Sequence, residues 1–532
     1  MLTSHDRELY LRSNVQVDPL FDSWYAWSHL IPPATAARNI TERHLPIMES
    51  YIASPQVHAA AVKNPKLLGG PFIDYDSNRV EEVIELLERT KRVHLDLIQL
   101  SEAISALDNM LRAEAKGFSL QPLYEKVPPA LRGYVELIYD TNNSASFRII
   151  EPLLYTSGFY KRSAQKLGMR LVQGDERPFV LSTPRLSSPN SLELSIPFDD
   201  ERIDWLFSTK RNPQKWKEIV SRFEIDVDDH VLLASFFTES PPKRYERYTG
   251  SGARWRYFGH ACILVETANI SVLFDPVLSY TYESHLSRYT YDNLPDLIDF
   301  VVITHNHQDH ILFETLLQIR HKVGTFVIPK SAGSGLVDPS LKLTLQSIGC
   351  KNVIELDQME SLAFENGSIT GLPFLGEHAD LDIQTKLGYL LRLGKQSLLF
   401  LADSCNLEPH LYERIHEQTG DVDAIFLGME CDGAPLTWAY GPLFTQKVDR
   451  AMDRSRRLAG SDYGQAINIV ERFRCKDAYV YAMGQEPWLN YVMSIKYAQD
   501  SRPIVDSDRL ISTCRSRGIA AERLFGEKEI LL

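Results

Sequence analysis

The sequence predicts an α/β protein in which a mostly helical α+β N-terminal domain, residues 1–245, precedes a C-terminal domain of two sheets covered by helices, residues 246–532. The 532 residues exceed what one hydrophobic core usually supports. Apolar residues at helical spacing dominate the first part, whereas short apolar runs typical of strands alternate with helices in the second. Between these parts, residues 240–252 read SPPKRYERYTGSG, whose prolines, glycines and basic residues are typical of a connecting segment.

The N-terminal elements are predicted from composition and periodicity. Residues 1–40 contain two tryptophans and two consecutive prolines, which predict irregular structure or short helices. Residues 79–116 place apolar side chains at helical spacing among Glu, Arg and Lys, and predict one long amphipathic helix or a helical pair. A further helical stretch is expected at 130–139. Apolar residues alternate strictly over 192–198, which predicts a strand with one buried face.

The C-terminal domain is expected to open with a hairpin, because alternating apolar runs at 261–266 and 270–274 flank the segment Thr-Ala-Asn. Helices are expected at 311–320 and 465–473. Further strands are expected at 300–303, 324–328, 351–356, 387–393, 397–401, 424–427 and 478–482. This alternation predicts two sheets covered by helices.

Composition excludes several classes of function. The formal net charge of -13 argues against a general nucleic-acid binder, since phosphate neutralisation needs a basic surface. The start of the chain has no basic-then-apolar signal segment, and no apolar stretch is long enough to span a bilayer, so we expect a cytoplasmic protein without a membrane partner. The six cysteines lie far apart without a CxxC pair, which predicts neither disulfides nor a thiolate zinc site.

A cluster of candidate metal ligands follows the strand expected at 300–303. Residues 301–310 read VVITHNHQDH, so His305, His307, Asp309 and His310 lie in the loop at the end of the strand. Imidazole and carboxylate are common protein metal ligands, and the loop predicts a site for one metal ion or two. A simply solvated loop is the alternative, but four ligand-type side chains at this spacing argue against it.

The run THNHQDH resembles the HxHxDH motif of the metallo-β-lactamase fold. GHACILVET and LFDP, which includes Asp275, resemble the opening hairpin and structural aspartate of that fold. The resemblance implies an αββα sandwich with metals bound on loops at one edge. It also implies that His305 and His307 bind one metal, and that Asp309 and His310 bind the other.

In the same fold an aspartate at the end of a later strand bridges the two metals. Asp403 fits this position, because it follows the strand expected at 397–401, with only Ala402 between them. Taken by itself, Asp403 could also be a turn or N-cap residue. The HxHxDH motif in the same chain favours the ligand role over this alternative.

The sequence departs from the zinc hydrolases of that fold in two places. Where they have a histidine after a strand and a glycine, this chain reads FLGEHAD, so either Glu377 or His378 is the ligand. Their last histidine has no counterpart, since the matching strand end, YVYAMGQEPW, offers only Gln485 and Glu486. Harder oxygen ligands suit iron and manganese rather than zinc, and open coordination positions are what an oxygenase metal requires. The substitutions therefore favour a diiron centre.

With Glu377 as a ligand and a large helical domain before the metal domain, the chain resembles the diiron β-hydroxylases of nonribosomal peptide synthesis, as in chloramphenicol biosynthesis. The resemblance implies a non-haem diiron monooxygenase of antibiotic biosynthesis that uses two iron ions, dioxygen and an external electron donor. It implies a substrate, p-aminophenylalanine, held as a thioester on a carrier domain of a nonribosomal peptide synthetase. It also implies that Glu377 binds one iron together with His305 and His307, and that Glu377 is required for catalysis. The N-terminal domain is expected to dock the carrier or to form a homodimer.

Other side chains are candidates for the substrate pocket or for support of the ligands. Trp438, Tyr440 and Trp488 follow expected strands and are candidates to hold an aromatic substrate, with ordinary core aromatics as the alternative. Glu430 is a candidate to accept the substrate amine or to make a hydrogen bond behind a ligand, with a solvated carboxylate as the alternative. His260 is expected near the metal, as a neighbour of the site or as a structural hydrogen-bonding residue.

Two competing functions remain open at this point. A dinuclear zinc hydrolase, such as a thioesterase or lactonase, would use metal-bound hydroxide as its nucleophile. The carboxylate at Glu377 and the missing late histidine argue against it. A non-catalytic scaffold with a structural metal site is the second competitor. The residues themselves do not reveal the substrate side chain, the stereochemistry, the electron donor or the docking surface.

Overall fold

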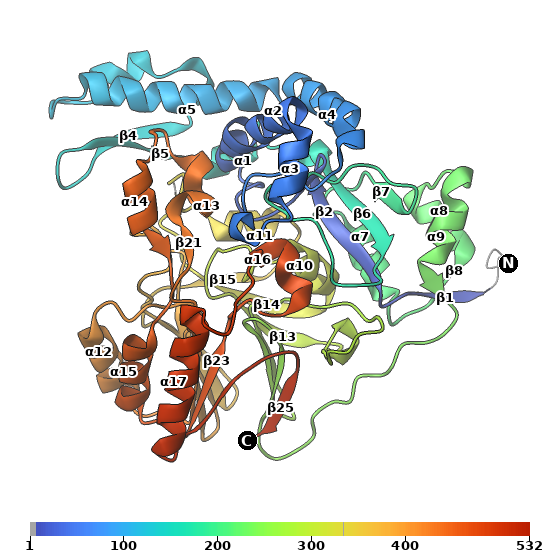
Figure 1. Ribbon diagram of the computed structural model, residues 1–532, viewed down its shortest axis with the longest axis vertical. Helices are drawn as coiled ribbons and strands as arrows, with labels where there is room; N and C mark the ends of the chain where they lie inside the picture. Colours follow the sequence, from blue (N-terminus) through green and yellow to red (C-terminus); the bar gives the residue numbers. More distant parts are fainter. Residues whose placement is uncertain (1–6, 334) are drawn as a thin grey trace.

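The computed structural model describes residues 7–333 and 335–532 and confirms the predicted fold class (Figure 1). Two seven-stranded sheets form the centre of the molecule, and the N-terminal helices, blue in Figure 1, lie above them. Residues 1–6, on which the predicted lack of a signal segment partly depends, lie outside the described residues. Within the described ranges, no helix has the length and apolar character needed to cross a lipid bilayer.

The first large sheet has the strand order β15-β14-β13-β12-β11-β10-β25. Its strands are β10 (Arg254–Gly259), β11 (Cys262–Glu266), β12 (Ser271–Phe274), β13 (Ile298–Val302), β14 (Val323–Pro329), β15 (Val353–Leu356) and β25 (Lys528–Leu531). β11 and β12 are the predicted hairpin, which is confirmed. From β12 to β15 the strands run parallel, so their carboxyl ends and the loops that follow lie at one edge.

The second large sheet has the strand order β16-β17-β18-β19-β20-β23-β24. Its strands are β16 (Ser361–Phe364), β17 (Gly367–Leu372), β18 (Gly388–Leu393), β19 (Gln396–Phe400), β20 (Ala424–Gly428), β23 (Asp477–Tyr481) and β24 (Ala520–Arg523). From β19 to β24 the strands are parallel. The loops after β19 and β20 therefore reach a common edge of this sheet.

Aromatic side chains fill the space between the two sheets. Phe274 of the first sheet stacks on Phe400 of the second with ring centroids 3.9 Å apart, and Phe400 stacks on Phe426 at 4.7 Å. Trp255 is fully buried and meets Phe426 edge-on. Each aromatic pair adds about 0.5–1.5 kcal/mol beyond the area that it buries. This core fixes the position of the loops of one sheet relative to the loops of the other.

Helices cover the outer face of each large sheet. The second sheet packs against α12 (Pro409–Thr419), α15 (Tyr463–Phe473) and α17 (Arg502–Ser516), at the lower left of Figure 1. The first sheet packs against α10 (Phe313–Ile319) and α11 (Leu341–Ser347). The hydrophobic core on this side continues into the N-terminal domain. That domain is therefore part of the layer that covers the first sheet.

A four-stranded sheet in the order β3-β2-β6-β7 lies within the N-terminal domain. Its strands are β2 (Val15–Phe21), β3 (Trp24–Tyr25), β6 (Gln165–Leu171) and β7 (Ser191–Leu194). A three-stranded sheet contains β1 (Glu8–Leu11), β8 (Gln214–Lys215) and β9 (Phe237–Thr238). The prediction of irregular structure or short helices over residues 1–40 was wrong for the three strands β1, β2 and β3. Every residue of β2 is buried, and its sequence, VQVDPLF, places Gln16, Asp18 and Pro19 inside the strand, although polar residues and proline usually argue against a buried strand.

The helices of the N-terminal domain are mostly short. They are α1 (Pro33–Asn39), α2 (Leu45–Ala53), α3 (Pro55–Ala61), α4 (Val80–Val93), α5 (Leu95–Glu114), α6 (Glu151–Tyr155), α7 (Glu201–Ser208), α8 (Trp216–Phe223) and α9 (His230–Ser235). The helical pair predicted over 79–116 is confirmed as α4 and α5. A π-helical turn, Ile40–His44, joins α1 to α2.

The helical stretch predicted over 130–139 was wrong. The chain there forms β4 (Val135–Tyr139), antiparallel to β5 (Ala145–Ile149). Val135 and Leu137 are buried while the residue between them is exposed, and the Asp140 carboxylate accepts hydrogen bonds from two N–H groups of the turn that follows. This alternation and the turn aspartate outweigh helix propensity. Residues 239–253, which include the predicted connecting segment, form neither helix nor strand.

A buried ion network joins the two parts of the chain. Arg177 Nη2 lies 2.7 Å from Asp18 Oδ1 on β2 and 2.7 Å from Glu314 Oε2 on α10. All three side chains are at least nine-tenths buried. Removal of one partner from such a network costs about 3–5 kcal/mol, because a buried charge is left unpaired. The network therefore fixes the N-terminal domain against the metal-binding domain.

Candidate metal centre

The loops at the edge of the two sheets bring the predicted ligands together. The four ligands of the THNHQDH run lie in the loop after β13, and all four are buried. Glu377 comes from the loop between β17 and β18, and Asp403 from the loop after β19. All six side chains belong to groups of three whose ligand atoms lie within 4.8 Å of one another.

His305, His307 and Glu377 form the first group. His305 Nε2 lies 3.1 Å from His307 Nδ1, which in turn lies 3.0 Å from Glu377 Oε1. His307 presents Nδ1 to the group because its other nitrogen, Nε2, lies 2.7 Å from the hydroxyl of Tyr440. Two nitrogens and one carboxylate oxygen thus converge in the manner of a metal site.

Asp403 lies between this group and a second one. Its Oδ2 atom is 3.8 Å from His305 Nε2 and 3.0 Å from His310 Nε2, and Asp309 Oδ2 is 3.7 Å from the same His310 nitrogen. The other oxygen of Asp403, Oδ1, is buried and has no hydrogen-bond partner within residues 7–333 and 335–532. A buried carboxylate oxygen without a partner is costly unless a cation binds it. Asp403 is therefore a candidate to bind a cation through this oxygen.

Asp275, the structural aspartate at the end of β12, orients the second group. It accepts hydrogen bonds from the backbone N–H of Thr304 at 2.7 Å and from the Thr304 hydroxyl at 2.6 Å. Its Oδ2 also lies 2.8 Å from His310 Nδ1. This contact places a proton on Nδ1 and leaves Nε2 of His310 free to face Asp403.

His260 forms a group of possible metal ligands with Asp309 and His310. Its hydrogen bonds nevertheless indicate that it orients Asp309 and does not bind a metal itself. The backbone N–H of Gly484 donates to His260 Nδ1 at 3.2 Å, which assigns the imidazole proton to Nε2. Nε2 lies 3.0 Å from Asp309 Oδ2 and donates to it. The geometry favours a hydrogen-bonding role for His260 over a ligand role. The loop after β23 (Asp477–Tyr481), where the late histidine is missing, thus supplies the backbone N–H of Gly484 as a donor. Glu486 in the same loop accepts a hydrogen bond from the Tyr257 hydroxyl.

Several residues of the site have left-handed backbone conformations. The φ angles are 50° at His260, 36° at Asp275, 62° at Glu377 and 45° at Ala402, which precedes Asp403. A non-glycine residue in this region costs about 1–2 kcal/mol. The surrounding sheets hold these residues there, and the resulting turns bring the side chains to the common edge.

Glu377 rather than His378 belongs to a group of candidate ligands. His378 stacks on the ring of His307 with centroids 4.6 Å apart, and its Nε2 has no hydrogen bond in the described part of the chain. Each three-residue group contains predicted ligands or His260, and His378 belongs to none of them. The geometry therefore favours Glu377 at the position that the sequence left open.

Burial and neighbouring carboxylates set the charges of the site. Burial raises the pKa of Glu377 well above its usual value, and the charges of Asp403 and Asp309 raise it further. Burial opposes the charged form of His310, but the nearby carboxylates of Asp403, Asp309 and Asp275 raise its pKa well above the usual value. The site therefore concentrates negative charge that bound cations would neutralise. Three imidazoles and three carboxylates without a thiolate are a donor set that fits iron.

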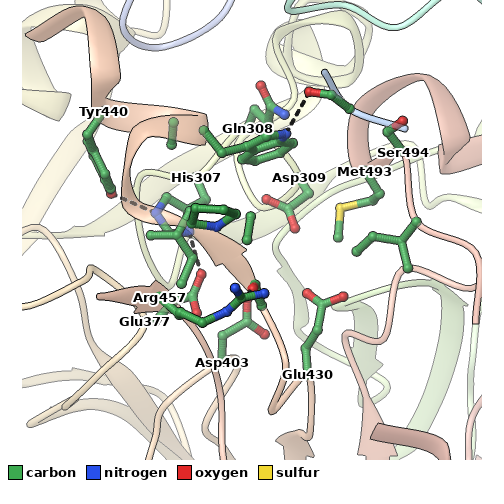
Figure 2. A pocket seen from close by; sticks show the side chains of 18 of the residues that line it. His307, Gln308, Asp309, Glu377, Asp403, Glu430, Tyr440, Arg457, Met493 and Ser494 are labelled. Atoms are coloured by element: carbon green, nitrogen blue, oxygen red, sulfur yellow. Dashed lines mark hydrogen bonds and ion pairs between the residues drawn. The ribbon is translucent and has the colours of Figure 1, made fainter. Parts of the chain in front are cut away.

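A cavity of about 260 Å³ opens beside the ligands (Figure 2). His307, Asp309, Glu377 and Asp403 form part of its lining. The rest of the lining includes Trp27, His29, Leu68, Gly69, Gln308, Glu430, Trp438, Tyr440, Arg457, Met493 and Tyr497. Trp438 and Tyr440 lie on α13 (Leu436–Tyr440), Arg457 begins β22 (Arg457–Leu458) and Met493 ends α16 (Asn490–Met493).

Two of the three aromatic residues that were predicted for the substrate pocket line this cavity, and the third does not. Trp438 and Tyr440 line the cavity as expected. Trp488 lies outside this lining, where the guanidinium of Arg288 sits 4.4 Å from its ring centroid. Glu430 lines the cavity, and its carboxylate accepts a hydrogen bond from the Tyr497 hydroxyl.

Two buried arginines of the N-terminal domain support the cavity wall. Arg38, near the end of α1, donates from Nε to the carbonyl oxygen of Pro442 at 3.0 Å. Arg43, in the π-helical turn, donates from Nη2 to the carbonyl oxygens of Trp438 at 2.7 Å and Ala439 at 3.3 Å. Burial lowers the pKa of Arg43 to about 10. The N-terminal domain thus completes a site whose ligands all lie in the other domain.

Trp27 and His29 are site residues that the sequence analysis missed. Both come from the N-terminal domain and line the cavity, and the His29 ring meets Tyr440 edge-on at 6.1 Å. No motif surrounds them, and a tryptophan in this region reads as an ordinary core residue. Only the packing of the two domains brings them to the metal ligands.

Comparison with known proteins gives two family matches. A model of the diiron non-heme beta-hydroxylase N-terminal domain matches residues 10–241, and a model of the beta-lactamase superfamily domain matches residues 271–434. A curated relative, the 4-amino-L-phenylalanyl-[CmlP-peptidyl-carrier-protein] 3-hydroxylase of Streptomyces venezuelae, is 41% identical over 98% of this chain and 99% of its own length.

Two solved structures are similar over the whole chain. CmlA, a diiron beta-hydroxylase from Streptomyces venezuelae, has a TM-score of 0.93 and 40% sequence identity, with 99% of this chain and 100% of that chain covered. The E377D mutant of the CmlA beta-hydroxylase has a TM-score of 0.91 and 39% identity, with 98% and 100% covered.

Proposed function

Because the chain belongs to the family of diiron non-haem β-hydroxylases, we propose that it hydroxylates the β-carbon of 4-amino-L-phenylalanine held as a thioester on a nonribosomal peptide synthetase carrier domain. The single observation that carries this proposal is the 41% identity to the carrier-dependent 3-hydroxylase across 98% of this chain. The match includes the N-terminal domain, which a zinc hydrolase of the same fold does not need. It therefore favours the hydroxylase over the zinc hydrolase.

The proposed ligand assignment follows the two groups of side chains. His305, His307 and Glu377 would hold one iron ion, Asp309 and His310 would hold the other, and Asp403 would bridge them. When bound, the two irons supply the activation of dioxygen, with electrons from an external donor. Asp275 and His260 keep the ligands oriented through their hydrogen bonds.

The cavity residues act on the substrate rather than on the metals. The rings of Trp27, Trp438 and Tyr440 line the space beside the ligands and exclude water from it. His307, with Nδ1 toward the ligands, donates from Nε2 to the Tyr440 hydroxyl and so ties this wall to the metal centre. The aromatic lining suits the ring of an aromatic amino acid.

A second cavity offers a route for the arm that carries the substrate. Its volume is about 470 Å³, and Gly69, Pro435 and Trp438 line both cavities. A carrier-bound thioester hangs from a long flexible arm and must reach a buried site from the surface. We place the arm in this second cavity, whose lining includes Glu42, Pro46 and other N-terminal residues, and the carrier domain at its mouth. Homodimer formation and a cytoplasmic location stay predictions.

The test uses purified protein with ferrous iron, a reductant and a carrier domain loaded with 4-amino-L-phenylalanine. With isotopically labelled dioxygen, mass spectrometry of the carrier is expected to show one labelled oxygen atom on the amino acid. Hydrolysis of the thioester without oxygen incorporation would instead support the zinc hydrolase. Absence of both reactions would overturn the proposed activity.

A further inference from the structure

Glu430 is a carboxylate of the cavity that the metal centre does not use. It follows β20, lines the same cavity as the metal ligands and belongs to none of the three ligand groups. Figure 2 shows its carboxylate pointing into the cavity, toward the side on which Asp309 lies. The residue is partly exposed and lines the cavity.

The carboxylate of Glu430 is held at one oxygen and open at the other. Oε1 accepts a hydrogen bond from the hydroxyl of Tyr497. In the described ranges, Oε2 takes no hydrogen bond and neither oxygen has a cationic partner within 4 Å. A carboxylate in such a cavity is costly without a compensating positive charge. The arrangement therefore leaves a place for a cationic ligand group.

The other carboxylates of the lining already have partners. Asp309, Glu377 and Asp403 belong to the metal groups. Asp432 pairs with Arg457 at 3.3 Å, and 62% of its side chain is exposed. Glu430 is thus the lining carboxylate that remains available to a bound molecule.

The covalent structure of the substrate determines where its positive charge must lie. The amino nitrogen and the β-carbon of an amino acid are both bonded to the α-carbon, so they lie about 2.5 Å apart. A substrate with its β-carbon at the metal ligands therefore has its α-ammonium group in the same part of the cavity. An ammonium group there needs an acceptor, and a carboxylate gives the strongest hydrogen bond to it.

We infer that Glu430, oriented by Tyr497, binds the α-ammonium group of the carrier-bound amino acid and selects aminoacyl over simple acyl substrates. The inference rests on the proposed function, because it assigns a recognition role within the same site. Glu430 is a specificity-determining residue in this assignment, and Tyr497 is a positioning residue that acts through it.

The experiment compares two thioesters on the same carrier domain, which differ only in the α-amino group. They are 4-amino-L-phenylalanyl and 3-(4-aminophenyl)propionyl thioesters. Wild-type protein is expected to prefer the aminoacyl carrier by about 10- to 100-fold in kcat/KM, the range of a hydrogen bond between charged groups. Glu430→Gln, which keeps the shape but removes the charge, should bring this ratio close to one while iron per chain stays constant. Tyr497→Phe should lower the ratio by a smaller factor.

The matched control is Glu365→Gln, which removes the charge of an exposed carboxylate outside the cavity, in the turn between β16 and β17, and should keep the wild-type ratio. If the propionyl carrier is not turned over, the ratio of the two dissociation constants, measured by calorimetry, replaces the kinetic ratio. A wild-type protein that hydroxylates or binds both carriers equally would overturn the role of Glu430 while leaving the proposed function intact, and this result does not depend on any variant folding. A Glu430→Gln variant that loses iron, or that keeps the wild-type ratio, would also overturn it. If wild-type protein hydroxylates neither carrier, the proposed function itself fails.

Discussion

The metal ligands and the cavity wall lie side by side, but the chain builds them in opposite ways. The ligands are polar, come from the C-terminal domain alone, and include four side chains of one loop. The wall is largely aromatic and apolar, and it combines Trp27 and His29 of the N-terminal domain with Trp438 and Tyr440 of α13. The ligand region therefore depends on the sheets beneath it, whereas the wall depends on the contact between two domains.

This difference separates two functions that share one cavity. Loss of a ligand side chain should change iron binding, because the donor atoms converge within a few ångströms of one another. Loss of a wall contact should change substrate binding while iron stays bound, because no wall residue except Tyr440 has a hydrogen bond to a ligand in the described part of the chain. Iron content and kinetic constants measured on the same variant can therefore assign each residue to one region.

The largest effect is expected from Glu377→Ala. This change removes one of three donors in the first group and should lower iron per chain and reduce turnover by more than about 100-fold, the upper range for a residue that only supports a ligand. The far-ultraviolet circular dichroism should be unchanged, because the two sheets pack without this side chain. Metal analysis, turnover and circular dichroism on one preparation check the three parts.

The control for Glu377→Ala is Glu365→Ala, which removes an exposed carboxylate in the turn between β16 and β17. It should keep iron content and turnover. Full iron content in Glu377→Ala would mean that His378 or another group is the ligand. It would also contradict the assignment of Glu377 to the region that binds iron.

The two regions also differ in how far the sequence predicts them. The spacing in THNHQDH identifies four ligands because metal coordination by one loop is a local property of the chain. Asp403 could be predicted because it follows a recognisable strand, β19, in the loop at its end. Glu377 could not be separated from His378, since the choice depends on the left-handed backbone at φ 62°. A backbone of this kind is imposed by the surrounding fold rather than by the residue.

The wall illustrates what the sequence could not predict. Trp27 and His29 lie in a segment that was expected to be irregular, and their position depends on the fully buried strand β2 and on the ion network of Arg177. Neither feature could be recognised from the sequence, because buried polar residues and a proline within β2 argue against a buried strand, and a buried salt bridge joins residues far apart in sequence. Segments with a half-exposed face, such as the pair α4 and α5, were predicted correctly.

A smaller effect is expected from Arg43→Met, which tests the wall from the N-terminal side. The variant loses hydrogen bonds to the carbonyl oxygens of Trp438 and Ala439, and each unsatisfied buried group costs about 1–3 kcal/mol. The free energy of unfolding should fall by about that amount, and kcat/KM should fall several-fold, while iron per chain stays at the wild-type value. Arg92→Met, on the exposed surface of α4, is the matched control. Loss of iron in Arg43→Met would show that the wall and the ligands are one unit.

The smallest effects, and the sharpest contrast, are expected from Trp438→Phe and Trp488→Phe. Trp438 lines both cavities and donates from Nε1 to the carbonyl oxygen of Gly69 at 3.1 Å. Its replacement should therefore raise KM for the loaded carrier by about 3- to 10-fold, the value of one hydrogen bond.

Trp488 lies outside both linings and its Nε1 is buried without a partner in the described ranges. Its replacement should leave KM unchanged and lower the free energy of unfolding by about 1 kcal/mol through weaker packing and a weaker contact with Arg288. Steady-state kinetics and thermal unfolding on both variants check the pair. An equal rise in KM for the two would mean that the substrate does not occupy the cavity between the ligands and α13, since only one of these rings borders it.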